Sequence, residues 1–214
     1  MKTYFDETLM SSRKLHVQQV LEGFEVVLGF ETRNKYRIFD ENMKPIAYSA
    51  EENTGWFGHL GRVMLKHWRT FTINIYSHER ELMYKAKFPF RWMFKTLYLE
   101  DRNGKSIGSL QQRFAFFYKR FDVVDPYGIL IAEIKSPIFK FWTFEFTDKG
   151  RKLGTVQKKW SGALNELFTD KDNFIVSYAQ PDLTLETKTL MLATCLMVDI
   201  VYFENNKGSG MFNS

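Results

Sequence analysis

The chain contains little cysteine, little proline and no long uninterrupted apolar run. A single cysteine among 214 residues, Cys195, excludes a disulfide-stapled scaffold and any zinc site built from several cysteines. Five prolines and 13 glycines, with no Ser/Gly/Pro-rich stretch, exclude collagen-like and low-complexity chains and any obvious linker between two halves. The first 17 residues hold no apolar signal-peptide core, so we expect a cytoplasmic protein.

Enzyme motifs are also scarce, whereas apolar residues are abundant. The chain has no G-x-S-x-G, H-E-x-x-H or phosphate-loop motif, and its four histidines lie in different segments, so we expect no enzymatic activity. Apolar residues make up 44% of the sequence and include 21 phenylalanines, which suffices for one large aromatic core. We expect an N-terminal segment at 1–16, a single domain at 17–205 and a flexible tail at 206–214.

Between residues 34 and 159, short alternating runs are separated by polar or Gly-containing turns, which is typical of β-hairpins. The predicted strand pairs are 35–39 with 46–48, 71–76 with 82–84, 96–99 with 106–110, 120–124 with 129–134, and 142–146 with 153–157. Five hairpins require at least ten strands, and closing them into a barrel removes exposed sheet edges. The sequence therefore predicts a mainly β protein built on a closed antiparallel barrel.

The end of the chain departs from this pattern. From Leu185 to Phe203 the residues are apolar around most of a helix circumference, which indicates burial on all sides. A membrane span needs about 20 apolar residues, but Asp199 interrupts this segment. We therefore predict a central helix at about 185–204 enclosed by the barrel, with a single membrane span as the alternative. The residues expected to fill the barrel are Leu190, Leu192, Leu196, Met197 and Asp199.

Four blocks of the sequence resemble the phospholipid scramblase family. Residues 158–174, KKWSGALNELFTDKDNF, are similar to the family's W-T-G…F-T-D-A-D-N-F block. Upstream, NKYRI at 34–38 resembles N-K-Y-E-I, RTFTI at 69–73 resembles R-P-F-T-L, and IGSLQQ at 107–112 resembles I-G-Y-V-I-Q. The blocks occur in the family's order and extend the resemblance over about residues 17–205.

The resemblance implies a tubby-like fold of the LURP-one-related superfamily, a closed barrel of about 12 strands around a hydrophobic C-terminal helix. It also implies association with phospholipid membranes and a calcium-stimulated movement of phospholipids between leaflets. For some members it implies nucleic-acid binding. The family's cysteine-rich, palmitoylated loops have no counterpart in this chain, which carries aromatic residues there instead.

These aromatic residues are the candidate membrane contacts. Trp56 and Phe57 lie in one loop, and Trp92 and Phe94 lie in another. Trp prefers the headgroup layer, and each nearby cation gains about 1 kcal/mol at an anionic surface. The accompanying cations are Lys85, Lys87, Arg91 and Lys95, and the first three would also suit a phosphoinositide-type headgroup site. The alternative is that the aromatic side chains cap an open end of the barrel.

The resemblance also implies a weak calcium site. Asp170 and Asp172 match the start of the family's calcium segment, which ends in an Asp at its twelfth position. This chain has Pro181 there, and Asp182 follows one residue later. The expected ligand set is Asp170, Asp172, Asn173, Phe174 and Asp182. The alternative is that the first two carboxylates only cap a turn or helix end.

The net charge of +5 is unevenly distributed. Residues 85–120 hold nine Lys/Arg and two Asp/Glu, whereas the rest of the chain is slightly acidic. A basic stretch interleaved with aromatic residues suits an anionic lipid surface or single-stranded nucleic acid. We therefore keep a nucleic-acid or protein-binding module using the 85–120 surface as the alternative function. Simple alternation of outward cations and inward rings along strands would produce the same pattern.

Overall fold

The computed structural model describes residues 3–20, 34–52, 70–140, 142–159 and 173–203. In these ranges an N-terminal helix, α1 (Tyr4–Ser11), precedes twelve strands, and helix α4 (Leu185–Val198) continues into a π-helical turn, η3 (Asp199–Phe203). A 3-10 turn, η1 (Ile138–Lys140), follows the ninth strand. The strands are β1 (Lys14–Val20), β2 (Lys35–Phe39), β3 (Pro45–Glu51), β4 (Phe71–Ser77), β5 (Leu82–Phe88), β6 (Thr96–Asp101), β7 (Ser106–Arg113), β8 (Tyr118–Val124), β9 (Leu130–Pro137), β10 (Thr143–Asp148), β11 (Arg151–Lys159) and β12 (Asn173–Tyr178).

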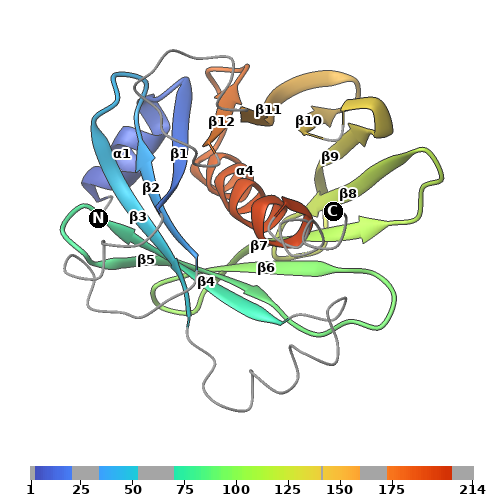
Figure 1. Ribbon diagram of the computed structural model, residues 1–214, viewed down its shortest axis with the longest axis horizontal. Coiled ribbons are helices and arrows are strands. Elements are labelled where there is room, and N and C mark those ends of the chain that lie inside the picture. The colour runs from blue at the N-terminus through green and yellow to red at the C-terminus, as the bar shows by residue number, and fades with distance from the viewer. Residues whose placement is uncertain (1–2, 21–33, 53–69, 141, 160–172, 204–214) are drawn as a thin grey trace, which may run out of the picture.

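The twelve strands form one closed antiparallel barrel (Figure 1). Each strand pairs with its sequence neighbours, and β1 pairs with β12 to close the ring, with Val17 opposite Phe174. All five predicted hairpins are present, so the predicted mainly β barrel is confirmed. The expected domain start at residue 17 falls within β1.

Helix α4 occupies the interior of the barrel (Figure 1). Every residue from Lys188 to Val198 is buried, which explains why the segment is apolar on all sides. The predicted central helix is confirmed, and its five named residues are all at most 1% exposed, namely Leu190, Leu192, Leu196, Met197 and Asp199. No helix in the described ranges combines the length and the hydropathy of a membrane span.

Local features let the helix fit inside the ring. Gly154 of β11 faces Met191, where an added Cβ would lie 2.5 Å from the methionine Cε and would also collide with the Ser177 carbonyl. Inside α4, Thr194 Oγ1 donates to the Leu190 carbonyl at 2.7 Å, so this buried hydroxyl has a partner. Buried Cys195 is a free thiol whose pKa is raised first by burial and then by the nearby Asp199 charge.

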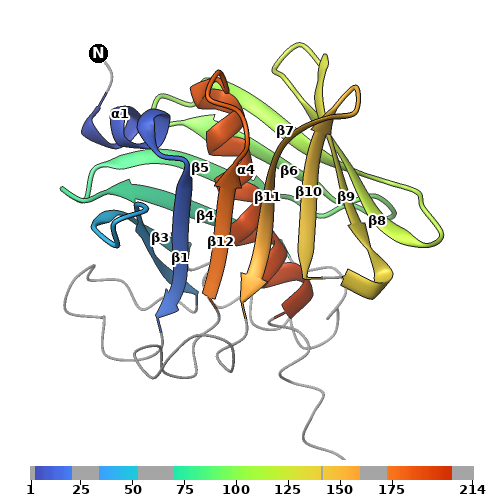
Figure 2. The same cartoon turned by 90° about the horizontal axis from the view of Figure 1, so that it is seen from above.

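The barrel has two different ends. At the turn end, tight turns join the strands, and the Asp40, Asp101 and Asp125 side chains each accept two backbone N–H groups within their own turns. Helix α1 lies at this end beside the first turns of α4 (Figure 2), with Phe5 and Leu9 fully buried. At the loop end, the described connections lie at 89–95, 114–117 and 138–140, and α4 runs toward this end.

Candidate functional site

Large apolar side chains are exposed on all three described connections of the loop end. Trp92 is 74% exposed on the first connection, Phe117 is 79% exposed on the second and Phe139 is 91% exposed on the third. The complete set, called the apolar rim below, is Phe90, Trp92, Met93, Phe94, Phe114, Phe116, Phe117 and Phe139. A gathering of large apolar side chains on one end of a protein marks an interaction surface.

The rim residues of the 114–117 connection pack against one another. The rings of Phe114 and Phe116 meet edge to face at 4.7 Å between centroids, and Phe117 lies 6.4 Å from Phe116. All three rings remain largely exposed, so they form an apolar knob at the surface. Beside them, Arg113 Nε donates to Asp122 at 2.7 Å, which fixes one cation at the base of the knob.

The turn end also exposes large apolar residues, and three of them gather on one turn. Tyr127, at 88% exposure, lies with exposed Ile129 and Leu130 in and beside the turn between β8 and β9. This cluster lies on a single turn, whereas the apolar rim extends over three connections. It nevertheless provides a matched exposed ring on the same molecule, at the opposite end of β8.

Inside the loop end, two lysines lie over one aromatic ring. Lys119 Nζ lies 3.6 Å from the centroid of the Tyr202 ring, and Lys95 Nζ lies 5.3 Å from the same centroid. Burial lowers the pKa of Lys95. Burial first, and then the neighbouring Lys95 charge, lowers the pKa of Lys119 to about 8. The interior of this end therefore concentrates positive charge around the final turn of the helix.

A second interior cluster fastens the end of the helix to the opposite wall. Asp199 accepts a hydrogen bond of 2.8 Å from the Tyr36 hydroxyl, and its other carboxylate oxygen lies 3.9 Å from Lys158 Nζ. The same ammonium group lies 4.1 Å from the centroid of the Phe203 ring. These charged groups are almost fully buried, and such groups persist in proteins when they are paired. We therefore infer that Tyr36, Asp199 and Lys158 hold the helix in place.

The structure divides the predicted membrane contacts into three groups. Trp92, Phe94 and Arg91 lie together on the exposed 89–95 connection, where Arg91 Nη2 donates to the Tyr98 hydroxyl at 2.7 Å. Lys95 instead faces the barrel interior. Lys85 and Lys87 belong to β5 on the wall, and Lys87 Nζ contacts Glu100 at 2.6 Å. Trp56 and Phe57 lie outside the described residues.

The structure does not bring the described members of the expected calcium set together. Asp170 and Asp172 lie outside the described residues, and Asn173 begins β12 at the loop end. Phe174 is buried against Phe203. Asp182 follows the other end of β12 and contacts Arg151 at 2.6 Å. The strand between them spans about 17 Å, and the described part of the chain holds no cluster of three potential metal ligands. The backbone therefore places Asn173 and Asp182 at opposite ends of β12.

The basic stretch at 85–120 does not form one continuous surface. Arg102 and Lys105 lie in a tight turn at the turn end, whereas Arg91 lies at the loop end. On the wall, Arg120 Nη2 contacts Glu133 at 3.0 Å, and Arg113 is paired with Asp122. Neighbouring strands thus supply carboxylates that neutralise much of this stretch.

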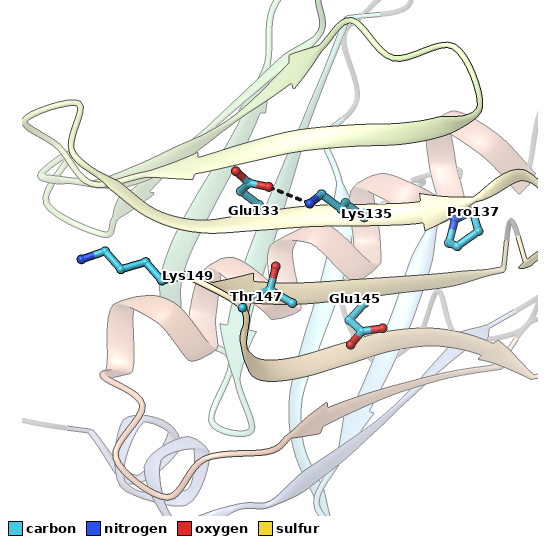
Figure 3. A pocket seen from close by; sticks show the side chains of 7 residues that line it. Glu133, Lys135, Pro137, Glu145, Thr147 and Lys149 are labelled. Carbon is cyan, nitrogen blue, oxygen red and sulfur yellow. Dashed lines mark ion pairs between the residues drawn. The ribbon is translucent and has the colours of Figure 1, made fainter.

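A hollow of about 430 Å³ lies on the outer wall between β9 and β10 (Figure 3). It is lined by Glu133, Lys135, Pro137, Glu145, Thr147, Lys149 and Gly150. Lys135 Nζ contacts Glu133 at 3.0 Å along β9, and Glu145 contacts Lys152 at 3.6 Å. Because Glu133, Lys135 and Glu145 are already paired at the exposed surface, these three side chains offer little charge to a ligand.

Sequence reasoning named Trp92 and Phe94 as membrane contacts and treated the rings at 114–118 only as part of a basic stretch suited to anionic lipid or single-stranded nucleic acid. It missed Phe139. The sequence Phe114-Ala-Phe-Phe-Tyr118 carries four rings in five positions. A strand with one buried face alternates apolar and polar residues. The failure of alternation at this point was the available signal for an exposed apolar loop.

Comparisons with known proteins found a matching family model and similar chains. The sequence model of the Scramblase family matches residues 4–205. The chain is 26% identical to phospholipid scramblase 2 of Bos taurus, over 94% of this chain and 72% of that protein. It is also 26% identical to phospholipid scramblase family member 5 of Homo sapiens, over 89% of this chain and 73% of that protein. The solved structure of an Arabidopsis thaliana protein shares 10% identity at a TM-score of 0.48, over 92% of this chain and 99% of that chain.

Proposed function

The chain belongs to the scramblase family, and from this premise we propose that it binds anionic phospholipid membranes peripherally through the loop end of its barrel. The observation that carries the proposal is the apolar rim, which exposes large side chains on three separate connections. Trp92 favours the headgroup layer, and Arg91 beside it supplies a cation to an anionic surface.

The position of α4 supports contact through the rim. The helix is buried along its length, so moving it into a bilayer would require the barrel to open. Opening the barrel would expose the large apolar side chains that line it to water, at a cost of about 1.5–3 kcal/mol for each one. The rim side chains are already exposed, and their insertion at the headgroup boundary gains free energy without unfolding the domain.

Vesicle flotation tests this proposal. Vesicles of phosphatidylserine and phosphatidylcholine should float the wild-type protein, and Trp92→Ala combined with Phe116→Ala should weaken binding at least tenfold. Tyr127→Ala is the matched control, because Tyr127 is an equally exposed ring at the turn end, and it should bind like the wild type. Wild-type binding should survive moderate salt, since apolar insertion is not screened. No flotation at any lipid composition would overturn the proposal.

Movement of phospholipid between leaflets is the first of two finer activities that we propose. The relatives named phospholipid scramblases support movement of phospholipid between leaflets, a process that breaks no covalent bond and so needs no catalytic residue. In vesicles carrying a fluorescent phospholipid, the reconstituted protein should expose the inner-leaflet probe to dithionite. An inner-leaflet signal that stays protected would remove lipid movement from the proposal and leave peripheral binding intact.

A calcium response is proposed for Asp170 and Asp172, whose sequence context resembles the family's calcium segment. Millimolar calcium should raise the melting temperature of the wild-type protein but not that of the Asp170→Ala, Asp172→Ala variant. The matched control is Asp182→Ala, because Asp182 pairs with Arg151 at the other end of β12. An unchanged wild-type melting temperature would contradict calcium binding.

The alternative of a nucleic-acid or protein-binding module has less support. Its cations would come from residues 85–120, and these are distributed over both ends of the barrel and partly neutralised. Single-stranded DNA that binds tightly while vesicles do not float would favour this alternative.

A further inference from the structure

We infer that Lys95 and Lys119 form a binding site for a phosphate group inside the loop end of the barrel, with the ring of Tyr202 as its floor. The site lies on the inner wall, separate from Lys85, Lys87 and the other outward cations. The proposed membrane binding through the apolar rim does not depend on this phosphate site. The site rests on the proposed function only in one respect, namely whether the phosphate belongs to a lipid headgroup.

Strand geometry aims both lysines inward. Lys119 has the same parity on β8 as buried Phe121, and Lys95 immediately precedes β6 with the same parity as buried Leu97. Successive side chains of a strand point to opposite faces, so both stems lie on the interior face. The Lys95 position is further fixed by Gln112, whose backbone N–H donates to the Lys95 carbonyl at 2.8 Å.

Helix α4 brings a floor to the two ammonium groups. Its terminal π-helical turn places the Tyr202 ring 3.6 Å from Lys119 Nζ and 5.3 Å from Lys95 Nζ, measured to the ring centroid. A cation gains about 0.5–2 kcal/mol over an aromatic ring, but one ring cannot neutralise two charges. The pair therefore retains positive charge facing into the mouth of the barrel.

No carboxylate in the described part of the chain neutralises this pair. Burial is the first cause that lowers the pKa of each lysine, and the Lys95 charge lowers the pKa of Lys119 further. The nearby carboxylates of β8 and β9 are engaged elsewhere, because Asp122 pairs with Arg113 and Glu133 pairs with Arg120 and Lys135. Two partly buried like charges repel each other, and an anion placed between them removes that cost.

A phosphate group suits this arrangement. It carries one or two negative charges and several acceptor oxygens, so it can accept hydrogen bonds from two ammonium groups at once. Lysine binds phosphate as a point charge and needs no planar geometry. A phospholipid headgroup at the rim and a free phosphate ester in solution both present this group.

The lysine pair can be observed directly by NMR after reductive ¹³C-methylation, which keeps the positive charge. In the free protein the Lys119 signal should titrate near pH 8. Millimolar sn-glycerol 3-phosphate should move this midpoint upward, because the anion favours the charged lysine. Glycerol, which lacks the phosphate, should leave it unchanged. An upward shift also caused by glycerol would overturn the inference. So would the absence of a shift with both glycerol phosphate and vesicles of phosphatidic acid.

Variants separate the site from the rim. Lys119→Met should weaken glycerol phosphate binding at least tenfold, Lys119→Arg should retain it, and exposed Lys105→Met at the turn end should leave it unchanged. A shift of Lys119 with soluble glycerol phosphate assigns the site to free phosphate esters. A shift only with phosphatidic acid vesicles assigns it to a headgroup, provided that the accompanying shift of the Lys95 signal is lost in Lys119→Met while flotation persists. Equal phosphate binding by wild type and a folded Lys119→Met variant would contradict the site.

Discussion

Tyr36 and Asp199, which lie 163 positions apart in the sequence, are joined inside the barrel by a hydrogen bond of 2.8 Å. The bond connects β2 to the turn that follows α4, at the loop end. It therefore holds the exit of the central helix against the wall on the side opposite the Lys95 and Lys119 pair.

Removing this bond should destabilise the protein. Tyr36→Phe deletes a buried donor to a carboxylate, and hydrogen bonds to charged groups contribute about 1.5–3 kcal/mol. We expect a loss of about 2 kcal/mol in the free energy of unfolding, measured by urea titration. Tyr48→Phe is the control, because its 3.3 Å contact with His78 is only partly buried, and it should change stability much less. Equal losses in the two variants would show that the Tyr36–Asp199 hydrogen bond contributes no more to the free energy of unfolding than the Tyr48–His78 contact.

Lys188 of α4 should hold α1 in place through hydrogen bonds. Its Nζ donates to the carbonyls of Leu9, Met10 and Ser12, where α1 ends and its carbonyl groups lack helical partners. Lys188→Met removes all three donors. Hydrogen exchange should then accelerate at least tenfold over Tyr4–Ser11 and much less over the β-strands. Lys105→Met is the control for losing an exposed lysine, and unchanged exchange in α1 would contradict the role of Lys188.

The lowered pKa of Lys119 gives the stability a defined pH dependence. Well below pH 8, Lys119 is protonated in both states, and the folded state bears the full cost of burying the charge. Between about pH 8 and the ordinary lysine pKa of about 10.5, the folded state releases the proton first, so this cost falls as pH rises. The stability of Lys119→Met relative to wild type should therefore decrease across that window. A difference independent of pH, measured by thermal unfolding, would contradict burial as the cause.

The sequence predicts the hairpins well because their turns are local. Asp40, Asp101 and Asp125 each fold a turn with their own side chains, and this chemistry is visible in a few consecutive residues. The pairing of β1 with β12 joins the two ends of the barrel, and no local pattern encodes which strands close the ring.

The interior lysines were harder to predict than the core helix. A segment that is apolar on all sides, such as α4, must be buried in a folded domain, whereas a lysine in a strand normally faces solvent. Lys95 and Lys119 lie where the barrel interior meets its mouth, so inward side chains there are only partly covered. Their position depends on the register of β6 and β8 around Tyr202, which emerges only when the barrel closes.

The orientation of the barrel on a membrane tests the account most directly. A nitrobenzoxadiazole fluorophore can be attached through Phe116→Cys at the loop end or through Tyr127→Cys at the turn end, because the native Cys195 is buried. With phosphatidylserine vesicles containing brominated acyl chains, the account predicts a blue shift and quenching at position 116 and neither at position 127. Quenching at 127 without quenching at 116, or no change at either position in vesicle-bound protein, would contradict membrane binding through the loop end.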